Sequence, residues 1–226
     1  MNQLHFYIIN ILLCFQLQAQ VAQNKMINET PIRILKSGVL LVRLESMENK
    51  IQHLIKASLQ EDCKSKCKEK IEKQILQLTL DRDAFNTEFI KAFKNNFKFC
   101  PVFFYYDKDQ IALAQTNYSR IYFLDSTQNN KFLANIPKES LLILKKDETP
   151  NSSNEGWLFQ TADGVLLQNG FPYITVNNFK TLMNRLASTD HQKKNCIYLV
   201  KKLNKNLHQY LYESDVRKME IEVDMQ

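Results

Sequence analysis

Glycine is scarce in this chain, with four among 226 residues, at positions 38, 156, 164 and 170. No spacing among them fits a P-loop or a dinucleotide-binding turn, where closely spaced glycines let backbone N–H groups approach a phosphate. The chain also contains no Gly-x-Ser-x-Gly stretch, which positions the serine nucleophile of many hydrolases. The sequence therefore argues against the nucleotide sites and the hydrolase site that depend on these motifs.

Histidine is equally rare, and His53, His191 and His208 are scattered along the chain. Zinc sites draw their ligands from closely paired motifs such as Cys-x2-Cys, and the sequence contains no such pair. We therefore predict no metal site and no bound cofactor.

The net charge is +6 and the pI is about 8.9, so basic residues moderately outnumber acidic ones. Lysines concentrate in residues 64–73 and 193–208, two segments with the periodicity of amphipathic helices. On such helices, lysines usually cover the solvent-facing side, whereas nucleic-acid binders favour Arg, Gly and aromatic residues at loops or on a sheet. We expect no nucleic-acid partner; the sequence leaves other partners and the oligomeric state open.

The first 23 residues carry no Lys, Arg, Asp or Glu, and an apolar run extends from Phe6 to Leu17. This run matches the apolar region of a signal peptide, whereas a membrane-spanning helix needs about 18–20 apolar residues. Small residues suited to cleavage stand at Ala19 and Ala22. We predict a signal peptide over residues 1–22 and export of the mature chain, without a transmembrane segment, to the periplasm or the exterior of a bacterium. The alternative is a buried N-terminal strand or helix.

The mature chain would keep Cys63, Cys67, Cys100 and Cys196, an even number that permits disulfides in an exported protein. Cys63 and Cys67 have the spacing of one helix face, which suits buried thiols equally well. Cys100 precedes a proline, as in thioredoxin-like motifs, but no second cysteine completes a Cys-x-x-Cys pair. Each of the four is therefore a candidate for either a disulfide or a buried thiol.

The pattern of apolar residues over 36–213 predicts a single mixed α/β domain. Its sheet would have about five to six strands, partly parallel, with a helical crossover on one face and a C-terminal helix pair. The unbroken apolar run at 102–106 is typical of a strand buried on both faces and predicts the central strand. Residues 23–35 would form an irregular leader and residues 214–226 a frayed tail. The predicted strands span residues 37–44, 102–106, 120–125 and 140–146, and a hairpin is predicted at 157–168. The predicted helices span residues 46–59, 61–78, 177–187 and 190–212, and a further helix begins at residue 83.

Four stretches, taken in order, resemble a family of uncharacterised exported proteins from Bacteroidetes-type bacteria: SGVLLVRL (37–44), AFKNNFKFCPVFFYYD (92–107), IYFLD (121–125) and NGFPYI (169–174). The Phe-Cys-Pro-Val element is the most specific of these features. The chain departs from the family pattern at Ile174, where a second tyrosine is expected, and at Asp125, where asparagine is expected. The resemblance implies export and a shared fold but no assigned catalytic residues, and the second departure weakens a catalytic role for Asp125.

The stretch FFYYDKD (103–109) resembles the nucleophile loop of haloacid-dehalogenase-type phosphatases, in which Asp-x-Asp follows an apolar strand. There the first carboxylate attacks phosphorus and the second handles the leaving-group proton beside a magnesium ion, roles that would fall to Asp107 and Asp109. Asp125 also ends a predicted strand, and open α/β sheets bind ligands at carboxyl strand ends. However, Ile111 stands where that motif has Thr or Val, and Asp-x-Asp is also common in plain turns.

These observations favour a soluble exported protein that binds a partner or supports an envelope structure without catalysis. One alternative is a metal-dependent phosphoester hydrolase that uses Asp107 and Asp109. A second alternative is a thiol redox protein that uses Cys100.

Overall fold

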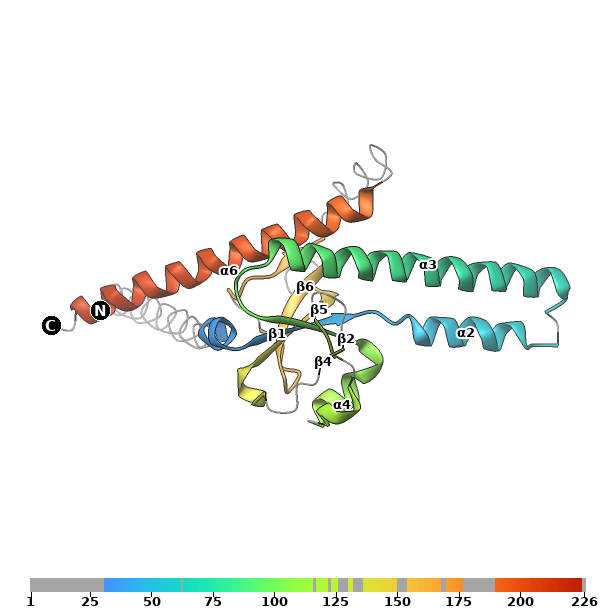
Figure 1. Ribbon diagram of the computed structural model, residues 1–226, viewed down its shortest axis with the longest axis horizontal. Helices are drawn as coiled ribbons and strands as arrows, with labels where there is room; N and C mark the ends of the chain where they lie inside the picture. Colours follow the sequence, from blue (N-terminus) through green and yellow to red (C-terminus); the bar gives the residue numbers. More distant parts are fainter. Residues whose placement is uncertain are drawn as a thin grey trace, which may run out of the picture.

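The computed structural model describes residues 31–61, 63–115, 117–121, 123–125, 130–131, 136–149, 154–167, 170–176 and 190–224. These residues form a mixed α/β fold, in which two long helices cover one face of a sheet (Figure 1). A short helix and several turns cover the other face. The predicted fold class, with a partly parallel sheet and a helical crossover, is confirmed.

The described strands pair in the order β4-β3-β2-β1-β5-β6-β7. β1 runs parallel to both of its neighbours, β2 and β5, and the other pairs are antiparallel. The central strand is therefore β1, and the prediction that the aromatic strand β2 is central is wrong. The bounds are β1 (Val39–Leu44), β2 (Val102–Tyr106), β3 (Phe123–Leu124), β4 (Asn130–Lys131), β5 (Leu141–Glu148), β6 (Glu155–Thr161) and β7 (Ile174–Thr175).

β1 occupies the centre because its side chains are apolar on both faces of the sheet. Leu40, Val42 and Leu44 belong to the core beneath the long helices, and Leu41 belongs to the core on the opposite face. Gly38 precedes the strand where a Cβ atom would collide with two backbone carbonyl oxygens, one of them from the turn before β5. The glycine therefore permits the close approach of β1 and β5.

The helical crossover from β1 to β2 consists of α2 (Glu48–Ser58) and α3 (Ser65–Asn96). The sequence predicts two separate helices over the range of α3, and this is wrong, because the helix runs unbroken through Asp83. No glycine or proline interrupts residues 65–96, and Asp83 is paired with Arg82 at 2.9 Å instead of beginning a helix. The second half of α3 packs on the sheet through an aromatic stripe that includes Phe89 and Phe93.

The C-terminal helix α6 (His191–Asp224) extends well beyond its predicted end and continues through most of the segment expected to be a frayed tail, 214–226. Ser214 is fully buried there, and Asp215 forms an ion pair with Arg33 at 2.9 Å. Arg33 lies in a helix at residues 31–37, inside the predicted irregular leader, where Ile32 is also fully buried. The ion pair joins the two segments. The predicted helix at 177–187 lies outside the described residues.

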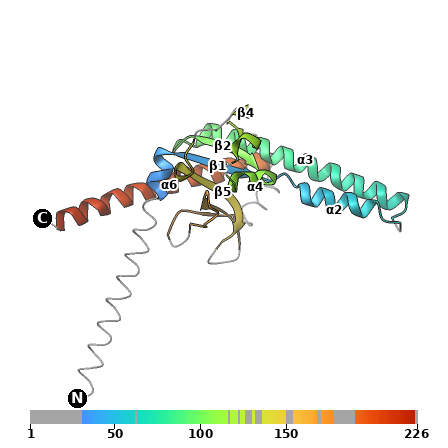
Figure 2. The same ribbon diagram turned by 90° about the horizontal axis from the view of Figure 1, so that it is seen from below.

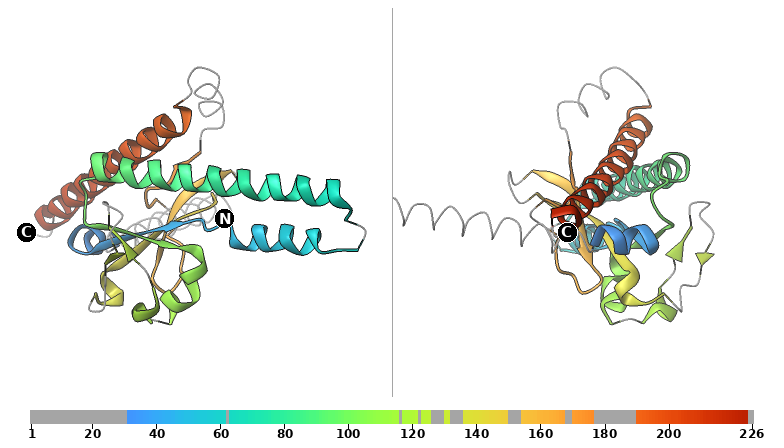
Figure 3. Two further views of the ribbon diagram at one scale, coloured as in Figure 1. Left: turned by 45° about the vertical axis from the view of Figure 1, so that its right-hand side comes forward. Right: turned by 90° about the vertical axis from the view of Figure 1, so that its left-hand side faces the viewer.

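α2 and the first half of α3 form an antiparallel pair that projects away from the sheet, seen from three further directions in Figures 2 and 3. We call residues 48–82 the helical hairpin. No residue of α2 is fully buried. A disulfide between Cys63 and Cys67, with Cα atoms 5.3 Å apart, closes the turn between the two helices. The disulfide reading is therefore correct for this pair, whereas Cys100 and Cys196 are free thiols.

Candidate functional site

The carboxyl ends of the parallel strands β1 and β2 meet at a polar connection. Asp107 directly follows β2 and opens a short 3-10 turn, Asp107–Asp109. Its Oδ1 accepts hydrogen bonds from the backbone N–H groups of Ser46 and Lys108, both at 2.9 Å. Because Ser46 lies just beyond β1, the Asp107 carboxylate ties the end of one strand to the end of the other.

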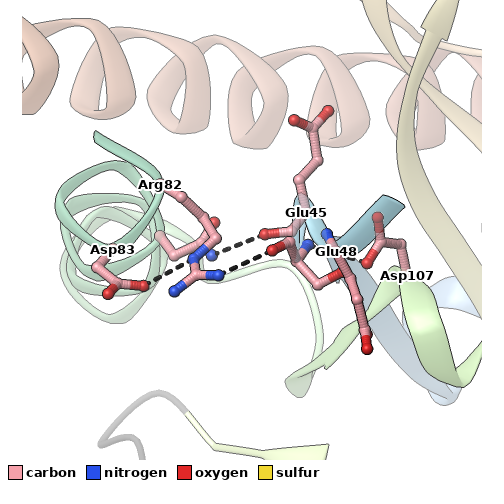
Figure 4. A network of polar contacts seen from close by, with 7 residues as sticks. Glu45, Glu48, Arg82, Asp83 and Asp107 are labelled. Carbon is pink, nitrogen blue, oxygen red and sulfur yellow. Dashed lines mark hydrogen bonds and ion pairs between the residues drawn. The ribbon is translucent and has the colours of Figure 1, made fainter. Parts of the chain in front are cut away.

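Two side chains of α3 hold the same connection from the helix side. Arg82, labelled in Figure 4, donates a hydrogen bond from Nη1 to the carbonyl oxygen of Ser46 at 2.9 Å. Asn86 donates from Nδ2 to the carbonyl oxygen of Glu45 at 3.2 Å, and only 4% of Asn86 is exposed. The segment between β1 and α2 is thus held by groups from α3 and from the turn after β2.

The connection contains a backbone conformation that side chains disfavour. Met47 has φ 56°, the left-handed region, and is the one non-glycine residue with positive φ among those described. Such a conformation costs on the order of 1 kcal/mol and persists where surrounding contacts determine it. The residue before Met47, Ser46, helps to hold the start of α2, since its Oγ accepts the N–H of Glu48 at 3.2 Å.

A hollow of about 230 Å³ opens beside this connection, on the sheet face that the long helices cover. It lies at the carboxyl ends of β1 and β5, which is where open α/β sheets bind ligands. Apolar groups line much of it, among them Phe85 and the single tryptophan of the chain, Trp157, which is 2% exposed. The polar residues that line it are Glu45, Asp81, Arg82, Asn86, Lys146 and Gln192.

The three candidate aspartates do not form one cluster. Asp107 and Asp109 share a turn, but β3 is antiparallel to β2, with Phe104 opposite Leu124. Asp125 therefore lies four residues along the strands from the position opposite Asp107, or about 13 Å. The structure places Asp125 away from the carboxyl edge of β2, so the ends of these two strands do not bring the carboxylates together.

The environment of Asp109 favours its neutral form. Burial raises the pKa of the Asp109 carboxyl; Lys108 opposes this effect, and the carboxylates of Asp107 and Glu48 reinforce it. Within the described part of the chain, no three His, Cys, Asp or Glu side chains are arranged to hold a metal ion.

The free thiols are far from the thiolate state that redox chemistry requires. Burial raises the pKa of the Cys100 thiol to about 12, against the opposing effects of a backbone hydrogen bond from Leu40 and the charge of Lys36. Burial likewise raises the pKa of Cys196 to about 12, with a further contribution from Glu88. Both cysteines pack against the apolar core under the long helices. Thiol chemistry at neutral pH needs a lowered pKa, so these surroundings oppose it.

Sequence reasoning missed Arg82, Asn86 and the hollow. The available signal was helical spacing, because Arg82 and Asn86 continue the stripe of Phe89 and Phe93 toward the start of α3. Polar residues on the same face as a buried aromatic stripe need polar partners from another element, and here those partners are the carbonyl groups after β1.

Comparisons with known proteins give no further assignment: no protein family, no curated protein and no solved structure matches the chain. Among the helices of the described residues, none is both long and apolar enough to cross a membrane.

Proposed function

We propose that this protein is an exported binding module, and that the hollow at the carboxyl end of β1 is its ligand site. The hollow carries the proposal, because it combines apolar walls, a polar rim and a position where α/β folds place their ligands. At about 230 Å³ it is smaller than the usual range for small-molecule sites, about 300–1,000 Å³. The ligand is therefore a small, largely apolar group, comparable in size with one large amino-acid side chain.

The polar side chains around the hollow favour binding over catalysis, because they are engaged in hydrogen bonds and ion pairs within the protein. Arg82 directs its guanidinium to a backbone carbonyl and to Asp83, and Asn86 is bonded to another carbonyl. Lys146 forms an ion pair with Glu155 at 2.8 Å. These side chains therefore build and hold the walls of the hollow, and the apolar surface that stays accessible in it, to which the half-buried Phe85 contributes, offers the binding energy.

The test uses Trp157 as a built-in reporter, since it lines the hollow and is the one tryptophan of the chain. Short branched alcohols, short carboxylates and benzene derivatives are titrated into the protein while its fluorescence and amide NMR shifts are followed. At least one class should shift the Trp157 emission saturably. Leu78→Phe, which narrows the hollow, should abolish the shift, whereas Ile111→Phe, at a side chain 72% exposed elsewhere, should preserve it. A panel that moves neither signal would refute the proposal.

Export is the second part of the proposal and rests on the apolar N-terminal sequence and the family resemblance. Residues 1–30 lie outside the described part of the chain. Mass spectrometry of the protein from its native host should find a mature N-terminus near Gln20 or Gln23, after cleavage at Ala19 or Ala22. An intact Met1 would contradict export by this route.

A further inference from the structure

The helical hairpin exposes more aliphatic surface than a solvated pair of helices needs. Leu59, Leu76 and Leu80 are 76%, 60% and 54% exposed, and Ile55 is 36% exposed. Hydrophobic residues scattered singly over a surface are normal, but a contiguous exposed patch marks an interaction site. The question is whether these four side chains are scattered or share one surface.

Helical geometry places the four on one flank of the hairpin. Leu54 and Ile75 are both half-buried, in keeping with positions along the line where α2 and α3 face one another. Ile55 follows Leu54 and Leu76 follows Ile75, so each is turned about 100° in the same sense from that line. In two antiparallel helices, equal rotations away from the line of contact bring both side chains to the same side of the pair. Leu59 and Leu80 each lie four residues further on and extend the same surface.

The net charge of the hairpin differs in sign between its two ends. Toward the tip, residues 56–73 contain six lysines against four acidic residues. At the base, residues 45–50 and 77–83 contain four acidic residues against one lysine and one arginine. A second hairpin lying head to tail against this one would set a positive tip over a negative base at both ends.

We propose that two copies of this chain associate through this flank, with their hairpins antiparallel, to form a four-helix bundle. The two-fold axis of such a contact sets α2 against α2 and α3 against α3 of the other copy, so the four aliphatic side chains of both copies lie in one shared interface. The charge pattern selects the antiparallel direction, since parallel hairpins would place lysines against lysines. This inference is independent of the ligand site in the hollow.

The size of the flank suits a dimer. The part of α3 from Ser65 to Arg82 is about 27 Å long, and two helices with their side chains span about 20 Å. The flat outline is thus about 500 Å², and side-chain relief increases it toward the roughly 800 Å² per partner of ordinary stable interfaces.

Sedimentation velocity and light scattering on the full chain test the proposal over a range of concentration and salt. The native protein should be a dimer that weakens as salt rises. Leu76→Glu with Leu80→Glu should weaken the dimer at least tenfold, and Ile111→Glu, a matched change at an exposed position away from the hairpin, should leave it intact. Circular dichroism of each variant checks that the fold persists. A native protein that stays monomeric up to its solubility limit, or a dimer unaffected by the paired glutamates, would overturn the inference.

Two further experiments examine the direction of the hairpins. Lys66→Glu should weaken the dimer, and adding Asp83→Lys in the same chain should restore it, because the reversed charges face each other across the interface. In addition, Lys66 and Asp83 lie about 25 Å apart along one helix, so a zero-length carbodiimide cross-link between them forms only between copies. Failure to find this cross-link in an isolated dimer, with Lys66 linked to groups near the other tip, would rule out the antiparallel arrangement.

Discussion

Replacing Asp107 by alanine should destabilise the protein much more than replacing it by asparagine. The alanine variant loses the acceptor for the N–H groups of Ser46 and Lys108 and so releases the tie between the ends of β1 and β2. A hydrogen bond to a charged group is worth about 1.5–3 kcal/mol, and the one to Lys108 is local enough to persist in part in the unfolded chain. Because Asp107 is half-buried, water recovers part of the loss. We therefore expect Asp107→Ala to lower the free energy of unfolding by about 2–3 kcal/mol.

Asparagine keeps a side-chain oxygen in place of Oδ1 and should cost about 1 kcal/mol or less. The assay is urea unfolding followed by the fluorescence of Trp157, which is 2% exposed when folded and becomes solvated on unfolding. By thermal unfolding, the alanine variant should melt about 4–12 °C lower than the native protein. Asp109→Ala is the control: the Asp109 carboxyl resists ionisation, so its removal should be neutral or slightly stabilising.

The outcome distinguishes a structural carboxylate from a nucleophile. Equal losses of stability for alanine and asparagine would refute the hydrogen-bonding argument. If Asp107 instead attacked a phosphoester, asparagine would abolish magnesium-dependent hydrolysis while leaving stability nearly unchanged. The same two variants therefore test both hypotheses.

Three further predictions concern the sheet, the hairpin and the response to pH. Gly38→Ala should cost about 2–3 kcal/mol in urea unfolding, because its Cβ meets backbone that cannot move aside; a neutral result would contradict the close approach of β1 and β5. Replacing both cysteines of the Cys63–Cys67 disulfide by serine should lower the free energy of unfolding by about 2 kcal/mol, the closure entropy of so short a loop. It should also increase amide hydrogen exchange in α2. Unchanged exchange would show that the disulfide does not hold the tip of the hairpin. Asp147 should titrate below Asp109 by NMR, because a hydrogen bond from Lys145 lowers the pKa of Asp147 whereas burial raises that of Asp109. The ion pair of Asp147 with Lys145 therefore stabilises the fold above the ordinary carboxyl pKa, and this stabilisation is lost as pH falls through the lowered pKa of Asp147. For Asp109 the sign is opposite, so its contribution to stability is lost as pH rises through its raised pKa. The reverse order of titration would refute both assignments.

The local pattern of apolar residues was sufficient to predict the helices and strands that are marked by a continuous or periodic apolar segment. The apolar runs of β1, β2 and β5 and the leucine spacing of α6 predict those elements, because a continuous apolar segment must be buried whatever covers it. The boundary between two predicted helices within α3 was wrong: aspartate is a common helix-start residue, but Asp83 lies in the middle of the continuous helix Ser65–Asn96. The end of α6 depended on its contact with residues 31–37, a partner distant in sequence.

The sequence alone determined the mixed α/β class and the main strands. It also excluded the P-loop and dinucleotide-binding motifs, which need closely spaced glycines. Each of these conclusions follows from the type and spacing of neighbouring residues. Tertiary structure decided everything that depends on which segments meet. It placed β1 at the centre, separated Asp125 from Asp107 by running β3 antiparallel, and paired Cys63 with Cys67. It also gathered Arg82, Asn86 and Trp157 around one hollow. Strand order and helix docking arise from the sum of many weak contacts across the whole chain, and no short stretch of residues encodes that sum.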